Sequence, residues 1–346
     1  MSPAYDRLRS LLGGAVLVGL TLLTSNASAQ DRPTQMSLRL TVGGKSAIFY
    51  LPLSVTERLG YFKQAGLDVE IADVQSGARA LQSLIGGSAD VGVGTFDHTI
   101  QMQAKGQPVV AVLQFGRYPG FVLGTISSKS IDYQGPQSLK GLKIGVTSPG
   151  SSTHFMAAYM LARSGLKPDD ASFVGTGVTS TAVAAARRGE IDAIVSSDPM
   201  ISLMQREGLV RIAADTRTPA GTQAVYGGPY PGGVVYTTPA FIEKHPATVQ
   251  AVVTAFVRAL KWMAIHSAQE IAATMPEEYA LGNREVYIQA LLASQEMYSR
   301  DGSFVPGAVE TAYQVLKLFD ASVANAKIDL SQTFVTGFVQ KALAEN

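Results

Sequence analysis

Two stretches of this chain, about a hundred residues apart, follow almost the same local pattern. Residues 86–101 and 188–201 each contain a glycine that ends a helix, an aspartate three residues later, a short apolar strand and a polar loop. Asp97 and Asp198 close these two loops before the next helix. A repeat at so long a period indicates two similar lobes rather than a solenoid, whose units are about 20–50 residues long. Since such lobes turn their strand-end loops toward each other, we expect a cleft between them that carries the function.

The first 29 residues are typical of a secretory signal peptide. Arg7 and Arg9 precede an apolar run of 13 residues, 11–23, and residues 27–29 read Ala-Ser-Ala, as cleavage sites do. The run is too short to cross a membrane, which takes about 20 apolar residues. We therefore expect export, with cleavage after Ala29.

Composition narrows the classes of protein further. The chain has no cysteine, so it has no disulfide, no thiol nucleophile and no lipid-modified cysteine at the cleavage point, and we expect a soluble protein of the periplasm. Removing residues 1–29 takes away two of the 28 basic residues and one of the 27 acidic ones, which leaves 26 of each. A neutral chain has no electrostatic footprint for nucleic acid or an anionic membrane.

Short apolar strands alternate with helix patterns, which predicts an α/β fold whose lobes each have a mainly parallel sheet flanked by helices. We expect lobe I to begin with residues 36–118 and lobe II to cover 119–233. Residues 234–346 would return to lobe I, because from residue 239 onward the pattern is helical only. Two crossing segments would then form a hinge that allows the lobes to close on a ligand.

The strongest candidate site lies in residues 143–154, where a strand enters a Gly/Ser loop that opens a helix. The first N–H groups of a helix have no partners inside the helix, and the helix dipole makes them electropositive. Ser151, Ser152 and Thr153 add hydroxyl donors without bulk. Together they are suited to a carboxylate or sulfonate. The alternative is that Ser151 or Ser152 is an ordinary helix N-cap.

Loops of the opposite lobe supply further candidate ligand contacts. They are Lys45, Ser46, Gly77, Thr95, Phe96 and Asp97. Gly77 would let the backbone approach a ligand, and Thr95 would donate a hydrogen bond. Phe96 would either stack on a planar ligand or fill the interior of the lobe. Lys45 would pair with an anion or simply be solvated.

Three more candidates lie near the rim and the hinge of the predicted cleft. Asp198 either caps the helix that begins after Pro199 or faces the ligand. Tyr118 and Tyr230 either close over a ligand or stiffen turns rich in proline and glycine.

The motifs of common enzymes and metal sites are absent from the sequence. None of the four histidines, at 98, 154, 245 and 266, has metal-ligand spacing, and there is no G-x-S-x-G, Walker loop or G-x-G-x-x-G. We therefore expect no catalytic residue, no metal and no cofactor.

Several short motifs, in this order and spacing, are similar to those of a known family. The motifs are Leu59-Gly60-Tyr61-Phe62, Gly66-Leu67-Asp68-Val69, Gly86-Gly87-Ser88-Ala89-Asp90, Leu139-Lys140-Gly141-Leu142-Lys143-Ile144-Gly145, Gly189-Glu190-Ile191-Asp192 and Asp198-Pro199. In them the chain resembles the periplasmic solute-binding proteins of ABC importers, in the nitrate/sulfonate/taurine branch. The resemblance implies a type II two-lobe binding fold and a monomer that delivers its ligand to an ABC permease in the inner membrane. It also implies ligand contacts from loops 43–49, 76–77, 95–97, 151–153 and around 198.

The chain departs from this family at two points. Sulfonate-type relatives often carry Trp before the Asp-Pro pair, where this chain has Ser197, which leaves room for a bulkier ligand such as an aromatic anion. Relatives that make a thiamine precursor use a cysteine motif, and this chain has no cysteine. We predict a binding protein for a small organic anion. The alternatives are an exported enzyme on the same scaffold and a ligand sensor for a membrane receptor, with nitrate and pyrimidines as other ligands.

Overall fold

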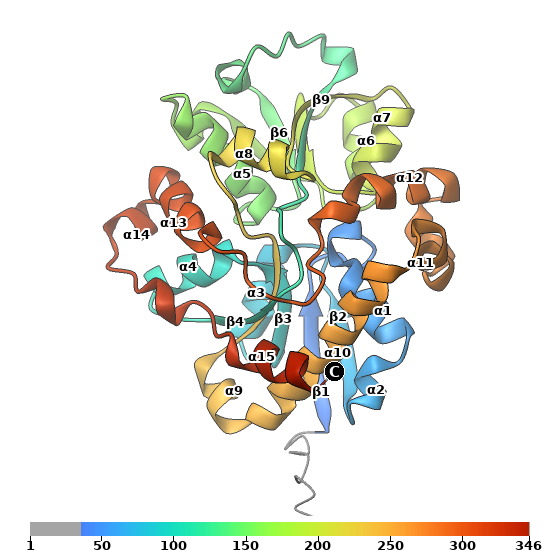
Figure 1. Cartoon of the computed structure of the whole chain (residues 1–346). Coiled ribbons are helices and arrows are strands. Elements are labelled where there is room, and N and C mark those ends of the chain that lie inside the picture. Colours follow the sequence, from blue (N-terminus) through green and yellow to red (C-terminus); the bar gives the residue numbers. More distant parts are fainter. Residues whose placement is uncertain (1–35, 346) are drawn as a thin grey trace, which may run out of the picture. The chain divides into compact units, whose positions relative to one another are not determined.

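The computed structural model describes residues 36–345, all of which belong to one compact unit. The expected signal peptide, residues 1–29, lies outside the described residues. Two five-stranded sheets, each flanked by helices, make up the described chain, and we call them with their helices lobe I and lobe II (Figure 1).

Lobe I carries the sheet with strand order β2-β1-β3-β10-β4. Its strands are β1 (Ser37–Val42), β2 (Asp68–Asp73), β3 (Val91–Thr95), β4 (Val110–Gln114) and β10 (Gly233–Thr237). Lobe II carries the order β7-β6-β8-β5-β9. Its strands are β5 (Val122–Ile126), β6 (Lys143–Val146), β7 (Ser172–Gly175), β8 (Ala193–Ser196) and β9 (Val210–Asp215).

The helices fall between and after these strands. The first part of lobe I has α1 (Leu51–Arg58), α2 (Tyr61–Gln64), α3 (Gly77–Ile85) and α4 (Asp97–Ala104). Lobe II has α5 (Ser152–Arg163), α6 (Ser180–Arg187), α7 (Met200–Arg206) and α8 (Pro219–Tyr226). After β10 come α9 (Pro239–Lys244), α10 (Pro246–Ile265), α11 (Ala268–Thr274), α12 (Arg284–Ser294), α13 (Ala308–Phe319), α14 (Ala321–Asn325) and α15 (Gly337–Ala344).

Both sheets are mixed: in each, four strands run in one direction, as expected of a mainly parallel sheet, and one strand runs against them. In lobe I, β1 pairs with β2 and β3 in parallel, whereas β10 is antiparallel to β3 and β4. In lobe II, β6 is parallel to β7 and β8, and β5 is antiparallel to β8 and β9. The reason is topological. β5 and β10 are each the first strand after the chain crosses between lobes, so they start at the edge where their neighbours end.

The sequence pattern missed β9 and α8 and found the other nine strands and the main helices between them close to their true bounds. β9 is an edge strand in which only Val210 is buried, so it lacks the apolar run that marks an inner strand. Helix α8 begins at Pro219, a residue suited to the first position of a helix. The side chain of the preceding Thr218 accepts a hydrogen bond from Gly221 N–H.

The core of lobe I is built around α10. Among the described residues, this helix alone is long and apolar enough to cross a membrane by length and composition. Its residues Val253, Phe256 and Leu260 are fully buried, and it packs against α1, α2 and α15. The apolar face of α10 is therefore explained by a protein interior.

The two crossing segments run side by side at the hinge. Phe115 N–H donates to Gly233 O at 2.9 Å, and Gly232 N–H donates to Gly116 O at 3.0 Å. A Cβ on Gly232 would lie 2.1 Å from the carbonyl oxygen of Tyr118, so this close approach requires glycine. Farther along the chain, α12 packs against α7, and α13 packs against both α4 and α5. The C-terminal helices thus contact both lobes.

Candidate functional site

A small cavity of about 30 Å³ lies where the strand-end loops of the two lobes meet. Lobe I lines it with Gly43, Ala47, Phe49, Tyr50, Gly77 and Thr95, and lobe II with Phe121, Thr147, Ser151, Ser152, Thr153, Val178 and Ser197. This volume has room for about two or three water molecules. A larger ligand therefore needs the lobes to separate before it can enter.

The N-terminus of α5 forms the lobe II wall of this cavity. β6 ends at Val146, and Ser151 is the N-cap of the 12-residue helix. The side chain of Ser151 accepts no hydrogen bond from the first N–H groups of α5. The Ser151 hydroxyl instead donates to Ser148 O at 2.7 Å, so the N-cap alternative is right about its position and not about its side chain. The N–H groups and the dipole of α5 are therefore available to an anion in the cavity.

The hydroxyl groups of this loop mainly bond to one another. Thr147 Oγ1 donates to Ser151 Oγ at 2.8 Å, and Thr147 N–H donates to Thr153 Oγ1 at 3.0 Å. These bonds fix the loop, whose residues Thr147, Ser151, Ser152 and Thr153 line the cavity. Preorganised donors of this kind do not need to be reordered when a ligand binds.

Asp97, at the start of α4 in lobe I, reaches across to α5. Ser152 Oγ donates to Asp97 Oδ1 at 2.7 Å and also contacts Thr95 Oγ1, while Tyr230 OH donates to Asp97 Oδ2 at 3.4 Å. The Asp97 side chain is buried, and within residues 36–345 it forms no ion pair. Burial, and after it the charge of Asp97, raises the pKa of Tyr226 and Tyr230 well above the usual value of a phenol.

Asp198, the counterpart in lobe II, is held by different partners. Its Oδ1 accepts from Ser202 N–H at 3.0 Å in the first turn of α7, as the capping alternative expected. Its Oδ2 pairs with Arg217 Nη1 at 2.7 Å and accepts from Ser294 Oγ, at the end of α12, at 3.2 Å. Its carbonyl oxygen accepts from Ile48 N–H, of lobe I, at 2.8 Å. Asp198 is fully engaged and does not line the cavity.

The buried Arg217 balances the negative charge of Asp198. Burial opposes the charge of the guanidinium, but hydrogen bonds to Asp215 and the charges of Asp198 and Asp215 outweigh burial and raise the pKa of Arg217. The carboxylate of Asp198 is thereby neutralised where it lies.

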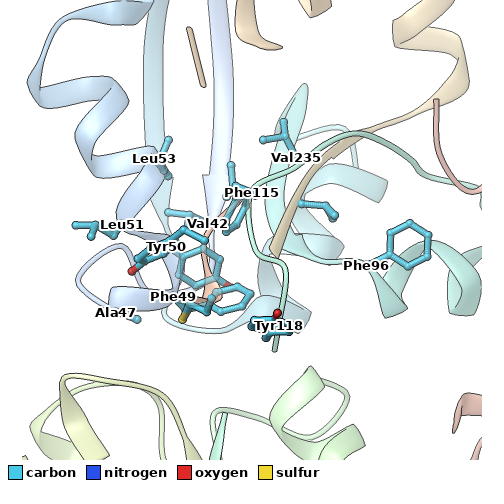
Figure 2. Close-up of a cluster of buried hydrophobic side chains, with 14 of the residues drawn as sticks. Val42, Ala47, Phe49, Tyr50, Leu51, Leu53, Phe96, Phe115, Tyr118 and Val235 are labelled. Atoms are coloured by element: carbon cyan, nitrogen blue, oxygen red, sulfur yellow. The ribbon is translucent and has the colours of Figure 1, made fainter. Parts of the chain in front are cut away.

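Besides Asp97, Asp198 and Tyr230, four of the twelve candidate ligand residues do not line the cavity. Phe96 is fully buried and packs edge-on against Phe304 and Phe334, with ring centroids 6.3 and 6.2 Å away. Figure 2 shows it well apart from Phe49 and Tyr50. Successive side chains of a strand point to opposite sides, so the residue after Thr95 faces the core. Phe96 therefore fills the lobe, the second of its two predicted roles.

The other three are Lys45, Ser46 and Tyr118. Lys45 forms an ion pair with Glu57, and Ser46 is half-buried without lining the cavity. Tyr118 lines a different pocket at the hinge. By contrast, Gly77, Thr95, Ser151, Ser152 and Thr153 do line the cavity, while Asp97 and Tyr230 lie directly behind them through the Ser152 contact.

The cavity also has an aromatic wall that the sequence did not predict, formed by Phe49, Tyr50 and Phe121. The rings of Phe49 and Phe121, from opposite lobes, stack with centroids 5.3 Å apart and planes 27° apart. Tyr50 meets Phe49 edge-on at 4.8 Å, and Figure 2 shows Phe49 and Tyr50 together at the end of lobe I. The signal available was the Phe49-Tyr50 pair directly behind the glycine-rich loop that starts at Gly43.

Gly44 allows the two lobes to meet beside this wall. A Cβ at Gly44, where φ is +125°, would lie 2.5 Å from Val178 Cγ2 of lobe II. Both the backbone conformation and the contact with Val178 therefore require glycine.

Two histidines contact the loop that precedes α5. His98 is fully buried, its Nε2 lies 3.4 Å from Gly150 O, and its Nδ1 has no partner among the described residues. His154 Nδ1 accepts from Gly150 N–H at 3.2 Å. Burial lowers the pKa of both side chains, so both are neutral near pH 7. Over residues 36–345 no three His, Asp or Glu side chains are grouped so that they could hold a metal ion.

Comparisons with known proteins agree with this architecture. The family model described as "NMT1/THI5 like" matches residues 49–270. A solved structure from Bordetella bronchiseptica RB50 is 42% identical, with a TM-score of 0.87 over 90% of this chain and 98% of that one. The alkanesulfonate-binding protein SsuA from Xanthomonas axonopodis pv. citri, bound to MOPS, is 18% identical, with a TM-score of 0.68 over 88% of this chain and 99% of that one. The fold of SsuA confirms the two-lobe α/β class expected from the sequence.

A third relative is an enzyme. The 4-amino-5-hydroxymethyl-2-methylpyrimidine phosphate synthase THI13 of Saccharomyces cerevisiae is 28% identical over 165 residues, which are 47% of this chain and 46% of that protein. The similarity to the synthase thus spans about half of either chain.

Proposed function

The chain belongs to the NMT1/THI5-like family, and we propose that it is the solute-binding component of an ABC import system. In this proposal the chain is exported to the periplasm, captures a small organic anion between its lobes as a monomer, and delivers it to a permease in the inner membrane. The similarity of its fold to the sulfonate-binding protein SsuA supports the proposal.

The observation that carries this proposal is the pairing of a helix N-terminus without a side-chain cap and an aromatic wall in one cavity. The N-terminus of α5, without a side-chain cap, provides the pole, and Phe49, Tyr50 and Phe121 provide the wall. A planar aromatic body stacks well between such rings. We therefore propose a carboxylate or sulfonate with an aromatic body as the ligand.

Ser197 supports a bulky ligand over a small one. Its short side chain lines the cavity directly before Asp198. A large residue in its place would fill the space that opens when the lobes separate, whereas serine leaves that space to the ligand.

Closure rests on a small number of polar contacts between the lobes. Among them are the bonds of Ser152 to Asp97, of Ile48 N–H and Ser294 to Asp198, and of Ser76 to Ser148. Each such bond contributes about 0.5–1.5 kcal/mol net, or about 1.5–3 kcal/mol where a charge takes part. A ligand that must be released to a permease needs only micromolar affinity, about 8 kcal/mol.

The similarity to the yeast synthase makes an enzyme on the same scaffold the second candidate. Against it stands the lack of any cysteine nucleophile in the chain. A bound compound that is recovered unchanged would support the binding protein, and a compound that is consumed would support the enzyme.

The test is a thermal-shift screen of aromatic and aliphatic carboxylates, sulfonates, nitrate and pyrimidines, followed by mass spectrometry of the bound compound. A ligand at a hundred times its dissociation constant should add about 2.7 kcal/mol of stability. Ser197→Trp should abolish this shift for an aromatic anion, while Ser303→Trp, at an exposed position, should leave it unchanged. A shift that survives Ser197→Trp would place the ligand outside the cleft.

A further inference from the structure

A second and much larger cavity lies on the hinge side of lobe I. Its volume is about 670 Å³, within the usual range of small-molecule sites. The walls come from the ends of α10 and α12, from α11, from residues 295–300 and from the first crossing segment, and lobe II contributes Pro219. None of the residues that line it lines the cleft cavity.

The floor of this hinge cavity is apolar. Leu260, Met263, Ile271 and Leu291 line it and are buried. At its rim, the Leu292 side chain remains 45% exposed, one of the few large apolar side chains that the described surface shows. Apolar surface that is open to solvent, such as the Leu292 side chain, gains free energy when an apolar body covers it, about 25 cal/mol for each Å² removed from water.

The charges at the rim are predominantly positive. Arg117 and Arg300 line the cavity, and neither forms an ion pair with a carboxylate within residues 36–345. The guanidinium carbon of Arg117 lies 5.3 Å from the ring centroid of Tyr118, which orients the side chain. Glu296 is the one acidic residue among those that line the cavity. A guanidinium can bind a carboxylate through two parallel hydrogen bonds.

From the apolar floor and the two unpaired guanidinium groups we propose that the hinge cavity is a second small-molecule site, for an organic anion with a flexible apolar body such as a medium-chain alkanoate. The apolar chain lies on Leu260, Met263 and Leu291, and the carboxylate meets Arg117 and Arg300. The hinge cavity and the cleft cavity share no lining residue, so the two ligands are proposed on separate observations.

The hinge cavity shares its walls with the contacts that close the lobes. Tyr298, which lines the cavity, donates from its OH to Ile48 O at 2.5 Å. Ser294, the last residue of α12, bonds to Asp198 three residues after the wall residue Leu291. An occupant that moves α12 or Tyr298 changes the stability of the closed form. Such an occupant therefore changes the affinity of the cleft for its ligand. By linkage, the cleft ligand changes the affinity of the hinge cavity for its occupant by the same factor.

The methyl group of Met263 offers a direct test. We would label the methionine methyl groups of the chain with ¹³C, record their NMR spectra, and add octanoate, octan-1-ol or acetate. Octanoate should shift the Met263 resonance in a saturable way and leave Met204, buried in the core of lobe II, in place. Acetate, which lacks the apolar body, should shift neither resonance.

Variants then separate the two parts of the site. Ala264→Trp, at an exposed wall position, should fill the cavity and abolish the Met263 shift, whereas Ala324→Trp on the exposed face of α14 should not. Arg117→Gln combined with Arg300→Gln should weaken octanoate at least about fivefold and leave octan-1-ol unchanged, with Arg211→Gln as the matched control.

Three results would overturn the proposal. The first is a Met263 resonance that does not move with octanoate, and the second is a shift that survives Ala264→Trp. The third is equal weakening of octanoate and octan-1-ol in the double arginine variant. Binding of an aromatic anion in the cleft, followed by the aromatic resonances of Phe49, Tyr50 and Phe121, is read separately, so failure at one site does not imply failure at the other.

Discussion

The loops that follow β3 and β8 have nearly the same sequence pattern, yet their aspartates, Asp97 and Asp198, have different partners. Asp97 and Asp198 are both buried, and both bond to the opposite lobe. Asp198 faces a buried arginine, Arg217, at 2.7 Å, whereas Asp97 is held by the hydroxyl groups of Ser152 and Tyr230. One carboxylate is paired with a cation, and the other lies next to the N-terminus of α5 and is held by hydroxyl groups alone.

This difference shows that a repeated local pattern determines the backbone position of a residue and not the residues that its side chain contacts. Each aspartate stands at the same place relative to its strand and the following helix. Their partners come from segments that the pattern does not contain, namely Arg217 after β9 and Ser152 at the start of α5. We infer that Asp198 is a structural anchor of closure and that Asp97 belongs to the electrostatics of the ligand site.

The largest expected effect comes from removing the arginine. Arg217→Met leaves Asp198 buried without its cation, which should cost about 3–5 kcal/mol in the free energy of unfolding, measured by urea denaturation. Arg211→Met, at an exposed site, should change it by less than about 0.5 kcal/mol. A loss below about 1 kcal/mol for Arg217→Met would mean that Asp198 needs no neutralising partner and resembles Asp97.

The two serines that cross between lobes should differ in importance. Ser152→Ala removes the shorter of the two bonds to Asp97, at 2.7 Å, and should weaken ligand binding by about tenfold or more. Ser294→Ala leaves Asp198 its bonds to Arg217 and Ser202, so we expect a loss of no more than about threefold. Titration calorimetry of both variants with the same ligand would measure this, and equal losses would erase the distinction between the loops.

Replacing each carboxylate by its amide should move affinity in opposite directions. Asp97→Asn can still accept from Ser152 but no longer repels an anion, so affinity for an organic anion should rise about three- to tenfold. Asp198→Asn weakens the pair with Arg217 and should lower affinity. If affinity falls in Asp97→Asn, the ligand donates a hydrogen bond or carries a positive charge toward Asp97.

The smallest effect should be a loss of folding stability on acidification, caused by the two histidines that contact the loop before α5, next to Asp97. Burial lowers the pKa of His98 and His154, which both contact Gly150, below the value of about 6.5 for an unfolded chain. The unfolded state therefore binds more protons, and stability should be lost as the pH falls below about 6.5 toward the folded pKa. His98→Gln should flatten this dependence in thermal melts between pH 7 and 5, whereas His266→Gln should not.

Much of the fold followed from periodicity. The bounds of α3 and β6 agree with the pattern to the residue, because helix-capping Ser76 and the apolar run 144–146 are local signals. Strand direction did not follow, since β5 and β10 are reversed by the chain crossings and not by any feature of their own sequence. Apolar content could not reveal β9 either, because an edge strand needs little of it.

The site was predictable where a residue acts through its own backbone and not where it acts through distant neighbours. Ser151, Ser152 and Thr153 line the cavity because the loop before α5 ends there. Phe121 forms the aromatic wall together with Phe49 of the other lobe, which stacks on it. Asp198 pairs with Arg217 and does not line the cavity. Contacts of this kind depend on the closed arrangement of both lobes.

The most direct test of the central claim compares matched pairs of ligands that differ in charge and hardly in shape. Benzoate with benzamide, and benzenesulfonate with benzenesulfonamide, would be titrated into the chain by calorimetry. If the N-terminus of α5 binds an anion opposite the aromatic wall, at least one anion should bind ten or more times as tightly as its amide, about 1.4 kcal/mol or more. Equal binding, or tighter binding of the neutral compounds, would contradict an anion site in the cleft.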